Sequence, residues 1–483
     1  MATVVIVLAA GAGTRMQSNL AKVLHPIAGL PIVSHVLNAA SSLNADHTVV
    51  VVGHQRAAVI EYLATSHPNV ITAVQDKQNG TGDATSVGLT ALAATGVALK
   101  DQDNVIVLAG DIPLIRPETL QPLHNLDRDA VVVTAIVDNP TGYGRIIRSG
   151  DLVIQIVEEK DASSQQRDIL EINSGIYAIK HQHLVNHLSN LSTNNAATEK
   201  YLTDVVKAIA DSGGKVLASL VDADDVMGVN DKEQLAQANG LLSDRIAQYW
   251  LHQGVTMLDP SSTWIDVQVN LAADVVLYPN VYLEGTTSVE SGAVIGPDTV
   301  LQNCKVGAGA KVISSRCIGS TIAAQASVGP FSYLRAETSL AEHSKVGAFV
   351  EVKKSRIGRG SKVPHLTYVG DAQIGEESNI GASTVFVNYD GEQKHNTIVG
   401  DHVRIGSDNM LVAPVEIGDG AYTAAGSVIT ENVPPGAMAI GRSRQRNIFG
   451  WVLKKRAGSK SAAAAEKHSQ SDIFPPTNNS EEA

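Results

Sequence analysis

The chain is poor in aromatic residues and cysteine, and it has no hydrophobic run long enough to cross a bilayer. Aromatic residues make up only 4% of its 483 positions, against 41 glycines, so part of the protein must bury small and aliphatic side chains instead. Cys304 and Cys317 are too few for a disulfide framework and lack CxxC spacing, so we expect both to be buried and reduced. We expect a cytoplasmic protein, because the N-terminus lacks a basic leader and no stretch reaches about 20 apolar residues.

An excess of positive charge is also missing. The formal net charge is −12, which argues against affinity for nucleic acid or for an anionic membrane, because both are polyanions. Any phosphate site must therefore be local. The length exceeds that of one ordinary core and predicts two globular domains.

The hydrophobic pattern changes near residue 230. Before it, apolar runs such as TVVIVLAA, HTVVVVG and NVIVLAG alternate with helix-like stretches, which is typical of a Rossmann-like α/β domain with a mixed, mainly parallel sheet. Apolar residues at helical spacing predict a linker helix over 231–254. We place the domains at 1–230 and 255–456, and we expect the small, polar tail at 457–483 to be disordered.

In the second half, apolar residues recur every six positions and are often followed by glycine, as in IGPDT, VGAGA and IGEES. This hexapeptide repeat is typical of a left-handed parallel β-helix, in which three repeats make one triangular coil and each buries one aliphatic side chain. The repeat fails at VNYDGEQKHNT, which predicts a loop that leaves the coil and could contact a ligand. The predicted inward positions are Val294, Val300, Val306, Val312, Ile318, Ile322, Val328, Leu334, Leu340, Val346, Val352, Ile357, Val363, Val369, Ile374, Ile380, Phe386, Val399, Ile405, Leu411, Ile417 and Ile429.

A glycine-containing loop directly follows the first predicted strand. Gly11 and Gly13 could bring backbone N–H groups to a phosphate, although a structural tight turn fits the sequence equally well. The loop is neither a complete GxGxxG nor a Walker A motif. Arg15 and Lys22 come just after it, where they could oppose phosphate charge or simply be solvated.

Polar residues follow later strands as well. Asp111 ends NVIVLAGD, so it lies at the edge where α/β sheets collect ligands, and Mg²⁺ is the expected occupant. Asn230 could be a second metal ligand, or it could be the N-cap of the linker helix. Another polar segment could read a base edge or form a turn: Gln75, Gln78, Gly80 and Thr81.

Basic residues in the second half have the spacing of the coil. Arg335 and Lys353 are 18 residues apart, so they should stack on one face, either as a phosphate site or as a solvated basic stripe. His365 could take a proton from a substrate ammonium, although any one of 15 histidines is more often an ordinary surface or packed residue. Nearby polar residues should converge with them: Tyr368, Asn379, Asn388 and Lys394.

Nine segments, in this order, carry a family resemblance: LAAGAGTRM, KVLHPIAG, QNGTG, LAGDIPL, PTGYGRI, IVEEKDA, EINSGIY, YLTDVV and GVND. Together with the repeats after them, they resemble the bifunctional N-acetylglucosamine-1-phosphate uridylyltransferase/glucosamine-1-phosphate acetyltransferase over residues 3 to about 451. The resemblance implies synthesis of UDP-N-acetylglucosamine. The second half would transfer acetyl from acetyl-CoA to glucosamine-1-phosphate, and the first half would transfer uridylyl from UTP to N-acetylglucosamine-1-phosphate and release pyrophosphate.

The resemblance also implies a role for each candidate residue. It assigns UTP and the UDP-sugar to Leu8, Ala9, Gly11, Gly13, Arg15, Lys22, Gln75, Gln78, Gly80, Thr81, Gly144, Glu158, Asn173 and Asn230, and Mg²⁺ to Asp111 and Asn230. It assigns glucosamine-1-phosphate to Arg335, Lys353, Tyr368, Asn379 and Lys394, with His365 as general base, and acetyl-CoA to Asn388, Tyr389, Ser407, Ala425 and Arg442. It further implies a homotrimer with shared acetyl-transfer sites. Three positions depart from the family pattern, with Ala21 where Pro is usual, Asp83 where His is common and Ser383 where Gly is common.

Two other functions fit the residues. The β-helix could be a regulatory or assembly module of an enzyme with only the first activity, or the whole chain could be a scaffold, because a fold does not prove a function. Release of CoASH from acetyl-CoA and of pyrophosphate from UTP distinguishes these alternatives.

Overall fold

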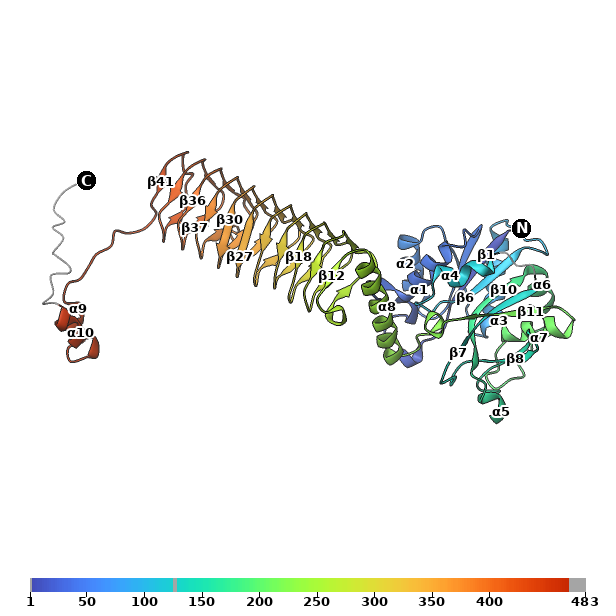
Figure 1. Ribbon diagram of the computed structural model, residues 1–483. Coiled ribbons are helices and arrows are strands. Elements are labelled where there is room, and N and C mark those ends of the chain that lie inside the picture. The colour runs from blue at the N-terminus through green and yellow to red at the C-terminus, as the bar shows by residue number, and fades with distance from the viewer. Residues whose placement is uncertain (1, 125–127, 469–483) are drawn as a thin grey trace.

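The structure is a computed structural model that describes residues 2–124 and 128–468. Figure 1 shows a globular N-terminal half joined through one long helix to a rod, with a short helical segment beyond the far end of the rod. Among the described residues, no helix is both long and apolar enough to span a membrane.

The described part of the N-terminal half contains a nine-stranded mixed sheet with the order β5-β4-β1-β6-β10-β7-β11-β9-β8. Strands β4, β1 and β6 are parallel neighbours, whereas β10 runs antiparallel to both β6 and β7. This arrangement confirms the predicted mixed α/β domain. The strands are β1 (Thr3–Ala9), β4 (His47–Val52), β5 (Ile71–Val74), β6 (Asn104–Ala109), β7 (Ala130–Ile136), β8 (Arg145–Ser149), β9 (Leu152–Val157), β10 (Glu171–Lys180) and β11 (Val216–Val221).

Helices cover both faces of this sheet. Alternate residues of β1 pack on opposite faces of the sheet. Val5 and Val7 belong to one buried cluster, and Val4 and Ile6 belong to another. The continuous apolar runs in the sequence follow from this burial on two sides. The first face is covered by α1 (Ile32–Ser41), α2 (Arg56–Ser66) and α4 (Pro117–Leu120), and the second by α3 (Thr81–Ala94), α6 (His181–Leu188) and α7 (Thr203–Asp211); α5 (Ser164–Arg167) is a short outer helix.

The helix α8 (Lys232–His252) connects the two halves (Figure 1). Its Arg245 donates a hydrogen bond to the Leu114 carbonyl at 2.7 Å and pairs with the buried Asp225 at 3.0 Å, which holds it to the first half. Further along, Ala247 and Trp250 pack into the core of the rod. The helix therefore closes the first coil with apolar side chains while its polar contacts keep it on the α/β domain.

The rod is a left-handed parallel β-helix, as predicted. Three sheets of short parallel strands, here called the first, second and third sheets, run along it. In the second sheet, for example, Leu334, Val352 and Val369 are partners in successive coils, and all three are buried. The first sheet runs from β12 (Thr256–Met257) to β41 (Met438–Ala439), the second from β13 (Trp264–Ile265) to β40 (Val428–Ile429), and the third from β14 (Asn270–Leu271) to β38 (Val415–Ile417).

The prediction of the inward residue is wrong at three repeats. The fully buried residues there are Ile295 rather than Val294, Leu301 rather than Val300, and Cys317 rather than Ile318. Each pair is apolar at both positions, so a six-residue spacing cannot choose between them, and a shift of one residue exchanges the two faces of a strand. Cys304 is buried as well, and both cysteines are free thiols, as expected.

The C-terminal segment differs in part from the predicted disordered tail. Within the predicted tail, the structure describes α10 (Lys460–His468). The helix α9 (Trp451–Lys455) precedes the tail, at the end of the range predicted as β-helix, and both helices lie beyond the last coil in Figure 1. The four alanines at 462–465 explain α10, because alanine has the highest intrinsic helix propensity. Residues 469–483, for which disorder was also predicted, lie outside the described residues.

Candidate functional site

A cavity of about 530 Å³ lies at the carboxyl ends of β1 and β6. Open α/β folds collect ligands at this edge of the sheet. The candidate residues from the sequence that line it are Leu8, Ala9, Gly11, Lys22, Gln75, Gln78, Gly80, Thr81, Asp111, Gly144, Glu158 and Asn173.

Two candidates of the glycine-containing loop, Gly13 and Arg15, do not line this cavity. Gly13 has a positive φ of 59°, and a Cβ atom there would lie 2.8 Å from the Cβ of Lys22. A side chain at this position would therefore displace Lys22. Arg15 is exposed.

Three candidates from distant parts of the chain meet at one end of the cavity. The Lys22 ammonium donates hydrogen bonds to the Asp111 carboxylate and, at 3.3 Å, to Oδ1 of Asn230. The N-cap of α8 is Asp231, whose carboxylate accepts from the Gln234 N–H at 2.9 Å. The side chain of Asn230 is thus not the helix cap, and its oxygen faces Lys22 instead.

This cluster suits a divalent cation that also binds a nucleotide phosphate. One carboxylate and one amide oxygen are hard ligands, and Mg²⁺ commonly takes only one or two protein oxygens before phosphate and water complete its shell. Within the described residues, no group of three or more His, Cys, Asp and Glu side chains could form a metal cage made of protein alone. The residues of this cluster therefore fit a Mg²⁺ ion shared with a nucleotide phosphate, and they do not fit a metal ion held by protein ligands alone.

The loop before α3 is fixed against residues 200–202. Gly80 has a φ of 106°, and a Cβ atom there would lie 2.5 Å from the Lys200 carbonyl oxygen, so only glycine fits. The Thr81 hydroxyl accepts from the Leu202 N–H at 3.0 Å. Nearby, the Gln78 amide donates to the Ala10 carbonyl at 2.7 Å and joins this loop to the glycine-containing loop.

The other end of the cavity presents a carboxylate and an amide. Glu158 accepts from the Thr203 hydroxyl at 3.1 Å, and the Asn173 amide donates to the Tyr177 hydroxyl at 2.6 Å. Burial, reinforced by neighbouring carboxylates, raises the pKa of Glu158, and burial also raises the pKa of Tyr177. The sequence analysis missed several lining residues that stand beside predicted ones in PTGYGRI and EINSGIY: Tyr143, Ser174, Gly175 and Tyr177.

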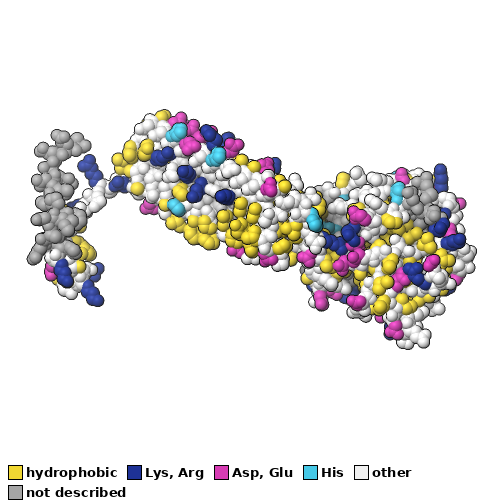
Figure 2. Space-filling model, viewed as in Figure 1, with side chains coloured by type: hydrophobic (Ala, Val, Ile, Leu, Met, Phe, Trp, Pro, Cys, Tyr) yellow, Lys and Arg dark blue, Asp and Glu magenta, His cyan; other side chains and the backbone are white. Residues whose placement is uncertain are grey.

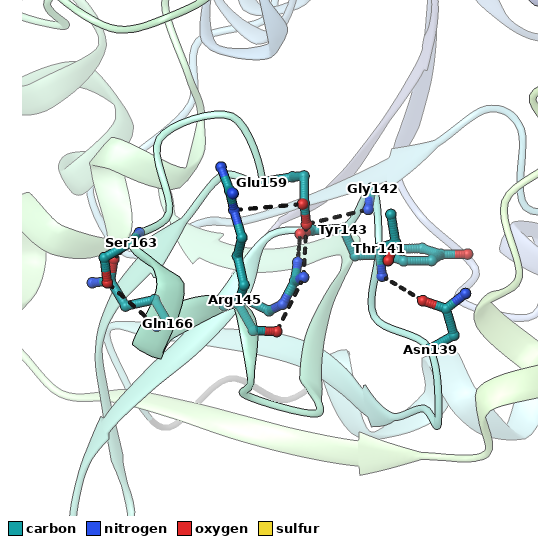
Figure 3. A network of polar contacts seen from close by, with 9 residues as sticks. Asn139, Thr141, Gly142, Tyr143, Arg145, Glu159, Ser163 and Gln166 are labelled. Atoms are coloured by element: carbon teal, nitrogen blue, oxygen red, sulfur yellow. Dashed lines mark hydrogen bonds and ion pairs between the residues drawn. The ribbon is translucent and has the colours of Figure 1, made fainter.

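An ion pair between the buried Arg145 and the partly exposed Glu159 supports the Gly142–Gly144 loop (Figure 3). Arg145 is 1% exposed, and its Nη2 lies 2.6 Å from Oε2 of Glu159. The same carboxylate oxygen accepts from the Gly142 N–H at 3.3 Å, and Arg145 also donates to the Tyr143 carbonyl. The loop that lines the cavity therefore rests on a charged pair outside it.

In the β-helix, three candidate cations lie together at the edge between the second and third sheets. Arg335 follows β25 (Tyr333–Leu334), and Lys353 ends β28 (Glu351–Lys353) one coil further on, as predicted. Lys394 reaches them from the loop at 387–398, and hydrogen bonding to the neighbouring Lys353 lowers the pKa of Lys394. Three cations brought together without an equal number of carboxylates favour an anionic ligand.

A buried carboxylate, Asp371, supports this cluster, and the sequence analysis missed it. Its Oδ2 lies 3.5 Å from Nζ of Lys353 and accepts from the Asn388 amide at 2.6 Å. Asn388 also lies 3.5 Å from the Tyr368 hydroxyl. A Cβ atom on Gly370 would lie only 2.4 Å from that hydroxyl, which explains the glycine. Asp371 directly follows Gly370, the partner of Lys353 in the next coil, so the repeat places it beside Lys353.

His365 and Asn379 are not part of this cluster in a single chain. They belong to β30 (Lys362–His365) and β33 (Asn379–Ile380) of the first sheet, where Asn379 pairs with Lys362 at the opposite end of the strand from His365. Within the described residues, neither side chain makes a hydrogen bond to the cation cluster. His365 lies at the edge between the first and second sheets.

The candidates for acetyl-CoA divide between the two edges. Ser407 and Ala425 lie in successive coils on the edge of His365, where the Gly426 N–H donates to the Ser407 carbonyl at 2.9 Å. Arg442 lies on the same edge in the next coil. Its Cδ is 3.7 Å from the position that a Cβ atom on Gly426 would take. Asn388 and Tyr389 lie instead beside the cations, and Tyr389 is 56% exposed.

The fold and these two groups of polar residues define a two-domain transferase. Residues 5–189 match the family model described as MobA-like NTP transferase domain, and residues 396–431 match the model described as bacterial transferase hexapeptide (six repeats). The chain is also similar to proteins named Bifunctional protein GlmU. The one from Streptomyces avermitilis is 51% identical over 469 residues and the one from Corynebacterium aurimucosum 49% over 472, each over 96% of both chains. The chain belongs to the bifunctional GlmU family, which confirms the predicted family and the prediction of two transferase activities.

Proposed function

We propose that this chain makes UDP-N-acetylglucosamine in two steps, with acetyl transfer in residues 255–456 and uridylyl transfer in residues 1–230. The observation that carries the proposal is a cavity that Lys22, Asp111, Glu158 and Asn173 line together, with Asn230 hydrogen-bonded to Lys22 beside it. A cation-rich end suits UTP, and a carboxylate with an amide suits the hydroxyl and acetamido groups of a sugar.

In the first half, the residues position two phosphates for an in-line displacement. Asp111 and Asn230 would hold Mg²⁺, which when bound neutralises phosphate charge. Lys22 and the backbone N–H groups near Gly11 neutralise the UTP phosphates, and Gln75 and Thr81 hold the uridine. An oxygen of the sugar phosphate attacks the α-phosphorus of UTP, and the bond to pyrophosphate breaks. Positioning and charge neutralisation provide the rate, so no covalent nucleophile is required.

In the second half, the three cations bind the phosphate of glucosamine-1-phosphate. His365 accepts a proton from the substrate ammonium, and the free amine attacks the thioester carbon of acetyl-CoA. The C–S bond breaks, and the thiolate leaves with a proton as CoASH. Ser407, Ala425 and Arg442 continue the edge of His365 for four coils, about 19 Å at about 4.8 Å per coil, which suits an extended ligand such as acetyl-CoA.

We also propose a homotrimer, in which neighbouring chains complete the acetyl-transfer sites. In one chain, the His365 edge and the cation edge lie on opposite sides of the second sheet, and both are open to the outside. A second copy can bring one edge against the other, and closed symmetric assemblies are common for such chains. We place the enzyme in the cytoplasm, where free thiols such as Cys304 and Cys317 persist.

Two assays on the purified full chain test the proposal. With acetyl-CoA and glucosamine-1-phosphate, release of CoASH is expected, and with UTP, Mg²⁺ and N-acetylglucosamine-1-phosphate, release of pyrophosphate is expected. Pyrophosphate without CoASH would make the β-helix an assembly module. The absence of both products would overturn both activities.

A further inference from the structure

The side chain of Gln75 is held by two acceptors inside the wall of the N-terminal cavity. Gln75 follows β5, lines the cavity and is only 4% exposed. Its Nε2 donates to Oδ2 of Asp83 at 2.8 Å and to the Gly80 carbonyl oxygen at 3.2 Å. Asp83 lies in the first turn of α3, directly after the Gly80 loop.

These two partners fix which way the amide faces. A carboxylate and a backbone carbonyl can only accept, so the Gln75 nitrogen must point to them and its oxygen must point away. Within the described residues, no hydrogen bond reaches this Oε1 atom. Gln75 therefore has an acceptor available, while both of its N–H groups are in use.

We infer that Asp83 is a positioning residue that makes Gln75 select a uracil base over cytosine. The inference rests on the proposed uridylyl transfer and adds the origin of its base specificity. Uracil carries a donor, N3–H, in the middle of its pairing edge, whereas cytosine carries a lone pair at N3. An acceptor in a fixed orientation binds uracil and repels cytosine. A site built for one hydrogen bond discriminates far better between two ligands than a site that recognises shape alone.

Shape cannot provide this discrimination, because the two pyrimidines have nearly the same size. The orientation of one amide is therefore decisive, and Gln75 cannot fix it without acceptor partners. Gly80 provides one of them through its backbone, and the Asp83 side chain provides the other. Asp83 is thus the partner whose removal leaves the amide partly free to turn.

The test compares UTP with CTP in the pyrophosphate assay, using the full chain and saturating N-acetylglucosamine-1-phosphate. In the D83A variant, the ratio of kcat/KM for UTP over CTP should fall about tenfold or more, mainly through KM. In D83N, which keeps an acceptor oxygen of the same size, the fall should be smaller. Acetyl transfer by the same samples and their thermal melting verify that the variants are folded.

The matched control is D76N. Asp76 is the next residue after Gln75, but its side chain is 80% exposed and pairs with Arg56 at 2.5 Å. This variant should keep the ratio of the native chain. Equal losses with UTP and CTP in D83A, or a native chain that uses both nucleotides equally, would overturn the inference. A native chain that releases no pyrophosphate from UTP would instead overturn the proposed function.

Discussion

The two halves of the molecule assemble their candidate sites in opposite ways. In the α/β domain, Lys22 and Asp111 come from distant positions to line one cavity of a single chain, and Asn230 joins them through a hydrogen bond from Lys22. The β-helix instead spreads its candidates along two outer edges, with His365 on one and Lys353 on the other. Figure 2 shows this rod as narrow, with most basic side chains on the half farther from the α/β domain and a patch of hydrophobic side chains beside them.

The difference follows from how each fold repeats. In a twisted sheet, crossovers return each strand end to the same edge, so polar residues after different strands converge on one point. In a β-helix, each coil repeats the one before it, so equivalent residues form columns and never turn toward one another. A single α/β domain can therefore close a site, whereas a single β-helix presents an open one that a second surface must complete.

If the two sites are separate, single substitutions will divide the two activities, and this is the largest expected effect. D111N should lower pyrophosphate release by about 10²–10³-fold and leave CoASH release unchanged, because it removes a charge only from the first cavity. H365A should lower CoASH release by about 10²–10⁴-fold and leave pyrophosphate release unchanged. Steady-state rates of both reactions on the same samples measure this. A variant that loses both activities while it keeps its native melting temperature would contradict the separation.

The shared site predicts that two inactive chains can restore acetyl transfer. H365A disables one edge and K394A disables the other, so a mixed assembly contains interfaces in which both intact edges meet. Equal co-expression should recover about a quarter of the native CoASH release, since each interface requires two independent choices. Each variant alone should stay near background. Native mass spectrometry verifies that the assemblies contain both variants. If such assemblies release no CoASH above background, His365 and Lys394 of one site belong to the same chain.

The same contrast governs what the sequence could predict. Asp111 and Lys353 were placed correctly because one rule fixes each, the strand end for the first and the coil spacing for the second. The role of Asn230 remained open because Asp231 beside it is an equally good helix cap, and only the fold shows that Asp231 takes it. Tyr177 was missed because its position depends on where a side chain points within the sheet, which spacing does not encode.

The β-helix shows a second limit. Coil spacing gave the period of the repeat but not its phase at Val300 and Leu301, where two apolar residues adjoin and only one can face inward. The phase becomes certain when the neighbouring coils stack. Sequence reasoning is therefore strongest where a single period controls the fold, and weakest where packing must choose between adjacent residues of the same kind.

A pH dependence should distinguish the cavity of the α/β domain from the edges of the β-helix. Burial, followed by the charges of Asp161, Asp204 and Glu199, raises the pKa of Glu158 above the ordinary glutamate value. As pH falls through this raised pKa, Glu158 gains a proton and loses an acceptor, so the KM for N-acetylglucosamine-1-phosphate should rise. E158Q should raise that KM about tenfold at neutral pH and abolish this dependence. KM measured at saturating UTP between about pH 5 and 8 tests it. A dependence that persists in E158Q would belong to the phosphate of the substrate.

The smallest expected effect concerns the ion pair behind the cavity (Figure 3). E159Q keeps an acceptor for the Gly142 N–H but leaves Arg145 buried without a charged partner, so the melting temperature should fall and the loop should loosen. The KM for the sugar phosphate should then rise about threefold to tenfold, and more than the KM for UTP, because Gly144 of this loop lies against Glu158 and Asn173.

E171Q is the matched control for E159Q. It disrupts the neighbouring pair between Arg148 and Glu171, whose atoms lie 2.6 Å apart in the same sheet, and neither residue lines the cavity. E171Q should therefore leave both KM values unchanged. An equal rise of both KM values in E159Q would show general loosening of the domain rather than a loop held for the sugar. A rise confined to the sugar phosphate would show that the cavity depends on a charged pair outside its walls, much as the cation cluster of the β-helix rests on the buried Asp371.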